Sequence, residues 1–168
     1  HVTGEGGIQE LTFARREGLP VYAETLHDLC CFNIDDYRKP NGLIYHLGTG
    51  LRSRKDNEAL WNALNSGTIN TIATDEYTTP LRIKLKGDTI KTATGGHAGI
   101  ETRGMITFSE GYKKGRLSLE RFVQVFSSNA AKLMGIYPQK GAILPGSDAD
   151  LVIWNPDGTR SISLSDLH

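Results

Sequence analysis

The segment SRKDNEALWNALNSGTINTIATD, residues 53–75, predicts a helix followed by a buried strand. Ser53 opens the pattern of an amino-terminal capping box, in which Asp stands in place of the usual Glu. Apolar side chains then recur at helical spacing, and Gly67 ends the helix. The strand predicted over 68–74 is rich in β-branched residues and stops at Asp75.

The same helix and strand alternation occurs earlier in the chain. Residues 5–17 have the apolar spacing of a helix, and residues 19–25 predict a short buried strand with a polar end. Long irregular segments follow each strand, over 26–50 and 76–99, and long loops are usually functional or disordered. Alternating helices and apolar strands indicate a parallel sheet. We expect the two strands to be parallel neighbours, with the helix of residues 53–66 on their outer face.

The rest of the chain, residues 100–168, changes from helical to strand-like patterns. The predicted elements are an irregular helix over 100–114, a helix capped by Ser118, a short helix capped by Ser127 or Ser128 and closed by Gly135, and strands over 149–154 and 159–164. We expect residues 142–164 to lie outside the α/β region as β-strands. Such strands would leave an open edge or an exposed apolar patch.

Composition excludes several classes of protein. The 19 basic and 19 acidic residues cancel, which argues against nucleic-acid binding and against capture by anionic membranes. No apolar run approaches the ~20 residues of a membrane span.

The two cysteines, Cys30 and Cys31, are adjacent in the sequence, which excludes a disulfide framework. They are best interpreted as packing residues, and they favour a reducing cytoplasm. The chain starts at His1 with no signal-peptide pattern, and its 168 residues could hold only part of a barrel of about 250 residues.

Two residues are candidates for chemistry at the strand ends. Asp75 would project from the carboxyl end of its strand, where a carboxylate can bind a metal ion and accept a proton. A turn or helix-capping role is the alternative for an Asp in this position. His1 could be a metal ligand, a frayed terminal residue or the remnant of a tag.

Other histidines and glycines give weaker signals. His27, His46 and His97 fall in predicted loops and lack the spacing of a metal-binding helix or finger. The glycine segments 48–50 and 95–99 could cradle a phosphate, but neither has the spacing of a known phosphate loop.

The segment SSNAAKLMGIYPQKGAILPGSDADLVIW, residues 127–154, strongly resembles the carboxy-terminal signature of the hydantoinase and dihydropyrimidinase branch of the amidohydrolase superfamily. GLPVYAET at 18–25, EALW at 58–61 and ATD at 73–75 match in order and spacing. The general form of the signature is shared with dihydroorotases and allantoinases. The resemblance covers essentially the whole chain, as the carboxy-terminal portion of such an enzyme.

The resemblance implies an α/β fold, the carboxy-terminal part of a (β/α)8 TIM barrel plus strands of a small β-sandwich. Residues 1–140 would belong to the barrel and residues 141–168 to the sandwich. The family binds two divalent metal ions, usually zinc (Zn2+). By resemblance, His1 is a metal ligand, and Asp75 is both a metal ligand and the catalytic proton acceptor. The other ligands of the family have no counterpart here, so the isolated chain should be inactive.

The resemblance also implies the reaction and the partners. The substrate would be a small cyclic amide, such as a hydantoin or dihydropyrimidine, opened by a metal-activated hydroxide in a cytoplasmic homo-oligomer, a tetramer. Backbone groups of Gly48 and Gly95 would hold the ring, where the family usually has Ser and Asn. Glu76 and Tyr77 follow the aspartate in place of the common His and Cys. The alternatives are a non-catalytic dihydropyrimidinase-like scaffold, an allantoinase or a dihydroorotase.

Overall fold

Two short parallel strands form the centre of the computed structural model, which describes residues 1–89 and 91–167. Strand β1 (Glu24–Leu26) pairs with β2 (Thr71–Ala73), with Thr25 opposite Ile72. This confirms the predicted parallel neighbours. The hydrogen-bonded ladder covers only the carboxyl ends of the predicted strands, because the Asn70 side chain, rather than a strand backbone, bonds to the amide of Ala23 at 3.0 Å.

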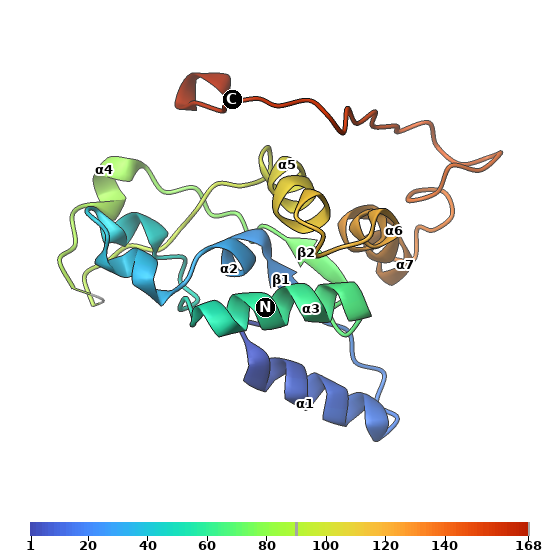
Figure 1. Cartoon of the computed structure of the whole chain (residues 1–168), viewed down its shortest axis with the longest axis horizontal. Helices are drawn as coiled ribbons and strands as arrows, with labels where there is room; N and C mark the ends of the chain where they lie inside the picture. The colour runs from blue at the N-terminus through green and yellow to red at the C-terminus, as the bar shows by residue number, and fades with distance from the viewer. Residues whose placement is uncertain (90, 168) are drawn as a thin grey trace.

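Helices, most of them short, make up the other regular elements (Figure 1). In chain order they are α1 (Glu5–Arg16), α2 (His27–Cys31), η1 (Ile34–Arg38), η2 (Gly42–Tyr45), α3 (Arg54–Ser66), α4 (Leu81–Lys84), α5 (Arg103–Ile106), η3 (Thr107–Lys113), α6 (Leu119–Val123), η4 (Gln124–Ser128), α7 (Asn129–Leu133) and η5 (Leu164–Asp166). Of these, η3 and η4 are π-helical segments that continue α5 and α6. Within residues 1–89 and 91–167, no helix has the length and apolar character needed to cross a membrane.

The capping signals of α3 are realised as the sequence predicts. The Ser53 hydroxyl accepts a hydrogen bond from the Asp56 amide at 3.3 Å, and the Asp56 carboxylate accepts one from the Ser53 amide at 3.1 Å. Gly67 follows the helix with φ 88°, a conformation that glycine adopts at no steric cost. The Asp56 carboxylate also accepts from the Glu5 amide at 2.9 Å, so one side chain fixes the amino-terminal ends of both α1 and α3.

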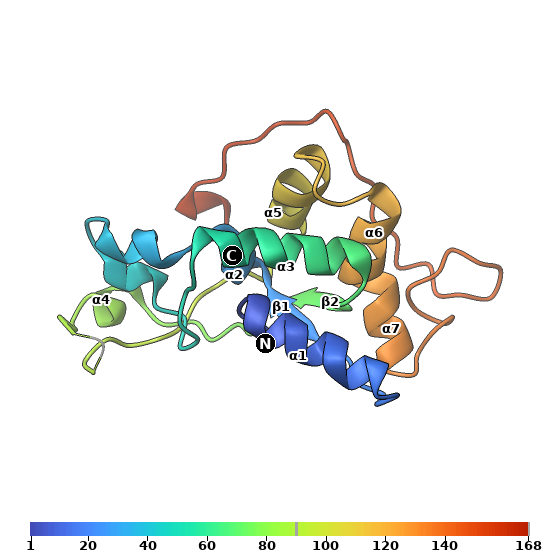
Figure 2. The same ribbon diagram turned by 60° about the horizontal axis from the view of Figure 1, so that its bottom comes forward.

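The core lies between α3 and the strand pair. Leu60, Trp61 and Leu64 of α3 are buried in one cluster with Leu26 of β1 and Ile72 of β2. Figure 2 shows α3 lying across the strands, with α1 beside it. Burial of these apolar side chains supplies the main favourable term in folding, since each contributes about 1.5–3 kcal/mol when fully removed from water.

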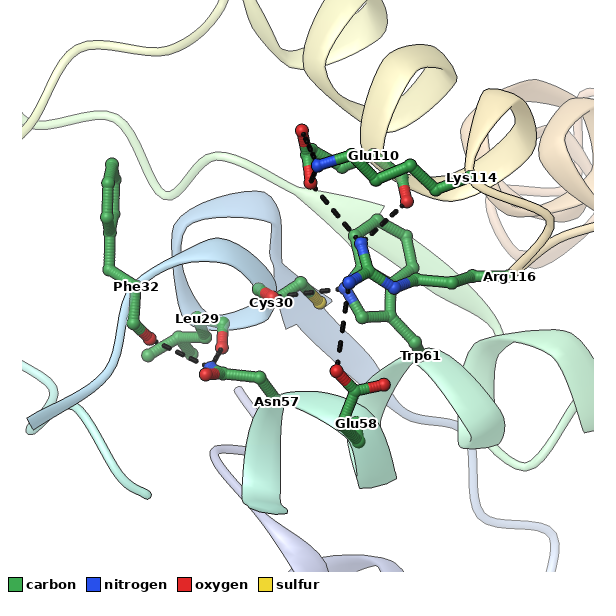
Figure 3. A network of polar contacts seen from close by, with 9 residues as sticks. All are labelled: Leu29, Cys30, Phe32, Asn57, Glu58, Trp61, Glu110, Lys114 and Arg116. Atoms are coloured by element: carbon green, nitrogen blue, oxygen red, sulfur yellow. Dashed lines mark hydrogen bonds and ion pairs between the residues drawn. The ribbon is translucent and has the colours of Figure 1, made fainter. Parts of the chain in front are cut away.

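A network of polar contacts joins α3 to α2 and η3 (Figure 3); its members are Leu29, Cys30, Phe32, Asn57, Glu58, Trp61, Glu110, Lys114 and Arg116. The Trp61 indole N–H donates to the Cys30 carbonyl at 3.0 Å. The buried Asn57 amide donates to the carbonyls of Leu29 and Phe32, at 2.6 and 2.8 Å. These bonds satisfy carbonyls at the end of α2 that have no partner within so short a helix. These bonds therefore hold α2, which directly follows β1, against α3.

One predicted helix boundary is wrong. Neither Ser127 nor Ser128 caps a new helix: Ser128 has helical φ and ψ of −67° and −31°, and its side chain makes no capping bond. The helix instead runs from the cap at Ser118 through α6, η4 and α7. It continues because Val125 and Ala131, on either side of the two serines, are both buried against the body of the protein.

The strand prediction for residues 149–154 and 159–164 is also wrong. In the described part of the tail there is no strand, because no described segment runs alongside to complete a ladder, and residues 164–166 form a 3-10 turn instead. Figures 1 and 2 show the tail looping out beyond α7 and then turning back past α5 as an extended trace. The predicted exposure of apolar side chains is confirmed, since Ile153 is 98% exposed. Trp154 holds the tail to the body by stacking on Phe108, with ring centroids 5.0 Å apart.

Candidate active site

His1 and Asp75 meet at the carboxyl ends of the strands. The His1 Nε2 atom lies 3.0 Å from Asp75 Oδ2. His1 reaches this position because Val2 runs alongside β1, with its amide donating to the Glu24 carbonyl at 2.8 Å. Asp75 follows β2 by two residues and has φ 49°, in the left-handed region that aspartate tolerates better than most residues. In parallel α/β sheets this edge is where ligands bind.

Glu24 is a third polar residue of this cluster, and the sequence reasoning missed its role. Its Oε1 lies 2.9 Å from His1 Nδ1, on the opposite side of the imidazole from Asp75. A carboxylate on one ring nitrogen orients a histidine and directs its other nitrogen to a partner. The only signal for this in the sequence was the polar end of the predicted strand over 19–25.

The donor types at this edge fit a divalent metal ion, but the set is incomplete. Imidazole nitrogen and carboxylate oxygen are both common zinc ligands, and a catalytic zinc site normally takes three protein ligands. Among residues 1–89 and 91–167, no group of three or more His, Cys, Asp and Glu side chains could hold a metal ion. His1 and Asp75 therefore provide donors of the right kind and need further ligands.

The structure brings Gly48 and Gly95 together, although they come from different loops. A Cβ atom added to Gly95 would lie 3.3 Å from the backbone nitrogen of Gly48, so the two main chains are nearly in contact. Gly48 has φ 95°, which favours glycine. The Thr79 hydroxyl donates to the Gly95 carbonyl at 2.9 Å and helps to hold the second segment.

Glu76 holds the next part of this loop close to the strand ends. Its carboxylate accepts hydrogen bonds from the amides of Gly99 and Ile100, at 2.8 and 2.7 Å. The Gly99 and Ile100 amides thereby lower the pKa of Glu76 below its ordinary value. His97 in the same loop contacts the Thr74 carbonyl through Nε2, and its buried Nδ1 has no hydrogen-bond partner among the described residues.

Replacing Glu76 with Gln should loosen the loop of residues 95–100 at neutral pH. Because the folded-state pKa is lowered, the carboxylate stabilises the loop fully above the ordinary glutamate pKa of about 4.3, and this contribution is lost as the pH falls through the folded value. Hydrogen exchange at Gly99 and Ile100, corrected for intrinsic rates, should be faster in Glu76→Gln at neutral pH, and only the wild type should lose protection on acidification. The exposed Glu10→Gln is the control. Equal protection in Glu76→Gln and wild type at neutral pH would contradict this role.

His27 and the two cysteines have structural positions. His27 is almost fully buried in α2 and not in a loop, and its Nε2 lies 3.2 Å from Asp28 Oδ1. Cys30 and Cys31 are free thiols, and burial raises the pKa of Cys30 and brings that of Cys31 to about 12. Both thiols therefore stay protonated near neutral pH and are unsuited to act as nucleophiles.

Comparison with known proteins shows similarity along the whole chain. The profile of the Amidohydrolase family matches residues 8–166. The D-hydantoinase of Geobacillus stearothermophilus is 38% identical over 173 residues, a match that covers 100% of this chain and 36% of that protein.

Solved structures agree with the sequence comparison. The D-hydantoinase of a Bacillus sp. AR9 has a TM-score of 0.91 at 35% identity, covering 98% of this chain and 37% of the other. The dihydropyrimidinase of Brevibacillus agri NCHU1002 has a TM-score of 0.82 at 37% identity, covering 89% and 33%. The chain thus spans little more than a third of the relatives that it matches. The predicted fold class, part of a hydantoinase (β/α)8 barrel, is confirmed by this similarity.

Proposed function

Since the chain belongs to the amidohydrolase family, we propose that the protein containing it hydrolyses cyclic amides of the hydantoin and dihydropyrimidine type. The similarity to a D-hydantoinase and a dihydropyrimidinase supports this substrate class. The observation that carries the proposal is the contact of His1 with Asp75, 3.0 Å apart, at the strand edge where α/β proteins place their chemistry.

The reaction requires a strong nucleophile and a proton acceptor. When bound, divalent metal ions lower the pKa of water and polarise the amide carbonyl. His1 and Asp75 would be among their ligands. The Asp75 carboxylate accepts the proton of the attacking water and passes it to the ring nitrogen as the amide bond breaks. Glu24 keeps the His1 imidazole turned so that Nε2 faces Asp75.

The ring of the substrate is held by main-chain groups in this proposal. The backbones of Gly48 and Gly95 lie next to each other, Gly48 is exposed and Gly95 is partly exposed, and neither residue has a side chain that would keep a planar imide from its main chain. The buried Thr49 hydroxyl, next to Gly48, has no hydrogen-bond partner among the described residues, and such atoms are normally paired.

Three finer features belong to the same proposal. The metal is zinc, which the imidazole and carboxylate donors suit. The complete protein is a homotetramer in the cytoplasm, where free cysteines such as Cys30 and Cys31 are stable. Residues 1–140 belong to the barrel and residues 141–168 to a β-sandwich, and the exposed apolar side chains of the tail are consistent with a covering partner.

The full-length protein that contains this chain should open the rings of hydantoin, 5-phenylhydantoin or dihydrouracil. Treatment with a chelator should abolish the activity, because the water is then no longer activated, and added Zn2+ should restore it. Ring opening can be followed by ultraviolet absorbance and product chromatography. Allantoin and dihydroorotate are the comparison substrates, and a preference for either would identify another cyclic amidohydrolase. A protein with confirmed metal content that opens none of these rings would contradict the proposal and favour a scaffold.

A further inference from the structure

Lys84, at the end of α4, is a buried lysine whose ammonium group donates to three main-chain carbonyls. The residue is 6% exposed. Its Nζ lies 2.7 Å from the Ile44 carbonyl and 3.1 Å from the His46 carbonyl, and it also bonds to the carbonyl of Gly96. An ammonium group has three N–H donors, so each of them has a carbonyl acceptor.

These carbonyls belong to the two segments that carry Gly48 and Gly95. His46 precedes Gly48 by two residues, and Gly96 directly follows Gly95. Figures 1 and 2 show α4 beside the η2 turn that precedes the first segment. Lys84 therefore bonds to both loops at the place where their main chains approach each other.

A buried charge at this position needs an explanation, because packing alone would not require it. Burying an ammonium group is unfavourable, and this burial lowers the pKa of Lys84. The Asp28 carboxylate, which lines the same cavity of about 300 Å3, acts in the opposite direction and favours the charged form. An apolar side chain could fill the space without the cost of desolvation. An ammonium group, with three N–H donors on one nitrogen, can instead draw three carbonyls from two loops toward one point.

We propose that Lys84 is a positioning residue, which holds the Gly48 and Gly95 segments at the spacing and orientation that the substrate ring requires. The inference rests on the proposed function, in which these glycine backbones bind the ring. In the described part of the chain Lys84 donates to these three carbonyls and makes no hydrogen bond to His1 or Asp75. Its loss should therefore weaken substrate binding and leave the proton transfer largely intact.

The test compares steady-state kinetics of Lys84→Met and wild type in the metal-loaded, full-length protein. KM for the cyclic amide should rise by at least about tenfold, while kcat falls by less than about threefold and the metal content is unchanged. Lys86→Met, an exposed lysine two residues away, is the matched control and should behave as wild type. If Lys84→Met does not fold, Lys84→Arg replaces it, because a planar guanidinium cannot direct N–H groups to three carbonyls around one nitrogen. The same rise in KM is then expected.

Chemical rescue separates positioning from a general loss of packing. Ethylammonium should lower the raised KM of Lys84→Ala, because it restores a cation with three N–H donors. Tetramethylammonium, which has the charge but no N–H donor, should not. An unchanged KM in Lys84→Met, or a fall in kcat alone, would overturn the inference while leaving the proposed function intact.

Hydrogen exchange tests the same contact without reference to activity. Amides of residues 42–50 and 94–99 should exchange faster in Lys84→Met than in Lys86→Met. If the wild-type protein opens no ring, the proposed function fails, and faster exchange still supports Lys84 as the residue that joins the two loops. Unchanged exchange in both segments would overturn that role.

Discussion

Asp75→Asn in the metal-loaded, full-length protein should lower kcat by about two to four orders of magnitude, the usual range for loss of a general base. The amide keeps the shape of the side chain and one oxygen, so part of its coordination and its contact with His1 can persist. It cannot accept the proton of the attacking water at neutral pH. KM should change little, because the proposed ring contacts come from Gly48 and Gly95 and not from Asp75.

Metal analysis has to accompany this measurement, because Asp75 has two proposed roles. Asp75→Ala removes a ligand as well as the base, so its rate should fall together with its metal content. Asp35→Asn is the control, since Asp35 is exposed on η1 and its carboxylate bonds to Arg38 and not to the site. Near wild-type turnover by Asp75→Asn with its metal ions present would mean that another group accepts the proton.

Trp61→Ala should destabilise the protein by about 3–5 kcal/mol, the usual cost of truncating a large aromatic residue in a core. Trp61 is 2% exposed, and its ring packs so closely on Gly111 that a Cβ added there would lie 2.9 Å from the indole. Truncation leaves a cavity between α3 and η3. It also leaves the Cys30 carbonyl at the end of α2 without its hydrogen bond.

The change can be measured as a shift of the denaturant midpoint of the full-length protein, followed by far-ultraviolet circular dichroism. Trp61→Phe should cost about 1–3 kcal/mol, since it keeps most of the packing and loses the hydrogen bond to the Cys30 carbonyl. Asn62→Ala, at the neighbouring exposed position of α3, should lie within about 0.5 kcal/mol of wild type. A Trp61→Ala protein as stable as Asn62→Ala would show that this cluster does not support the fold.

The elements that the sequence predicted correctly are those whose signals are local. The capping residues Ser53 and Asp56, the stop at Gly67 and the β-branched run before Asp75 all act within one turn or one strand. The errors arose where contacts with residues distant in the chain determine the local structure. Serine is a common capping residue, but the helix continues through Ser128 because residues on both sides of it are buried.

The residues of the candidate site also include some that could be predicted from the sequence and some that could not. Resemblance indicated His1 and Asp75, and the structure puts them in contact. The positions of Glu24 and Lys84 could not be predicted, because Lys84 meets carbonyls 38 and 40 residues away in the chain. No local pattern encodes a contact of that kind, and a buried lysine in a short helix has the same sequence signature as an exposed one.

The pairing of β1 with β2 has a consequence for the order of events on the ribosome. Next to this ladder, the Ala23 amide donates a hydrogen bond to the side chain of Asn70, 47 residues later in the chain. At a synthesis rate of about 5–20 residues per second, β1 leaves the exit tunnel about 2–9 s before the segment that completes it. During that interval Leu26 lacks the later partners that cover it in the folded protein, Ile72 of β2 and the buried residues of α3. The edge of β1 that pairs with β2 therefore stays unpaired until the later segment has been synthesised.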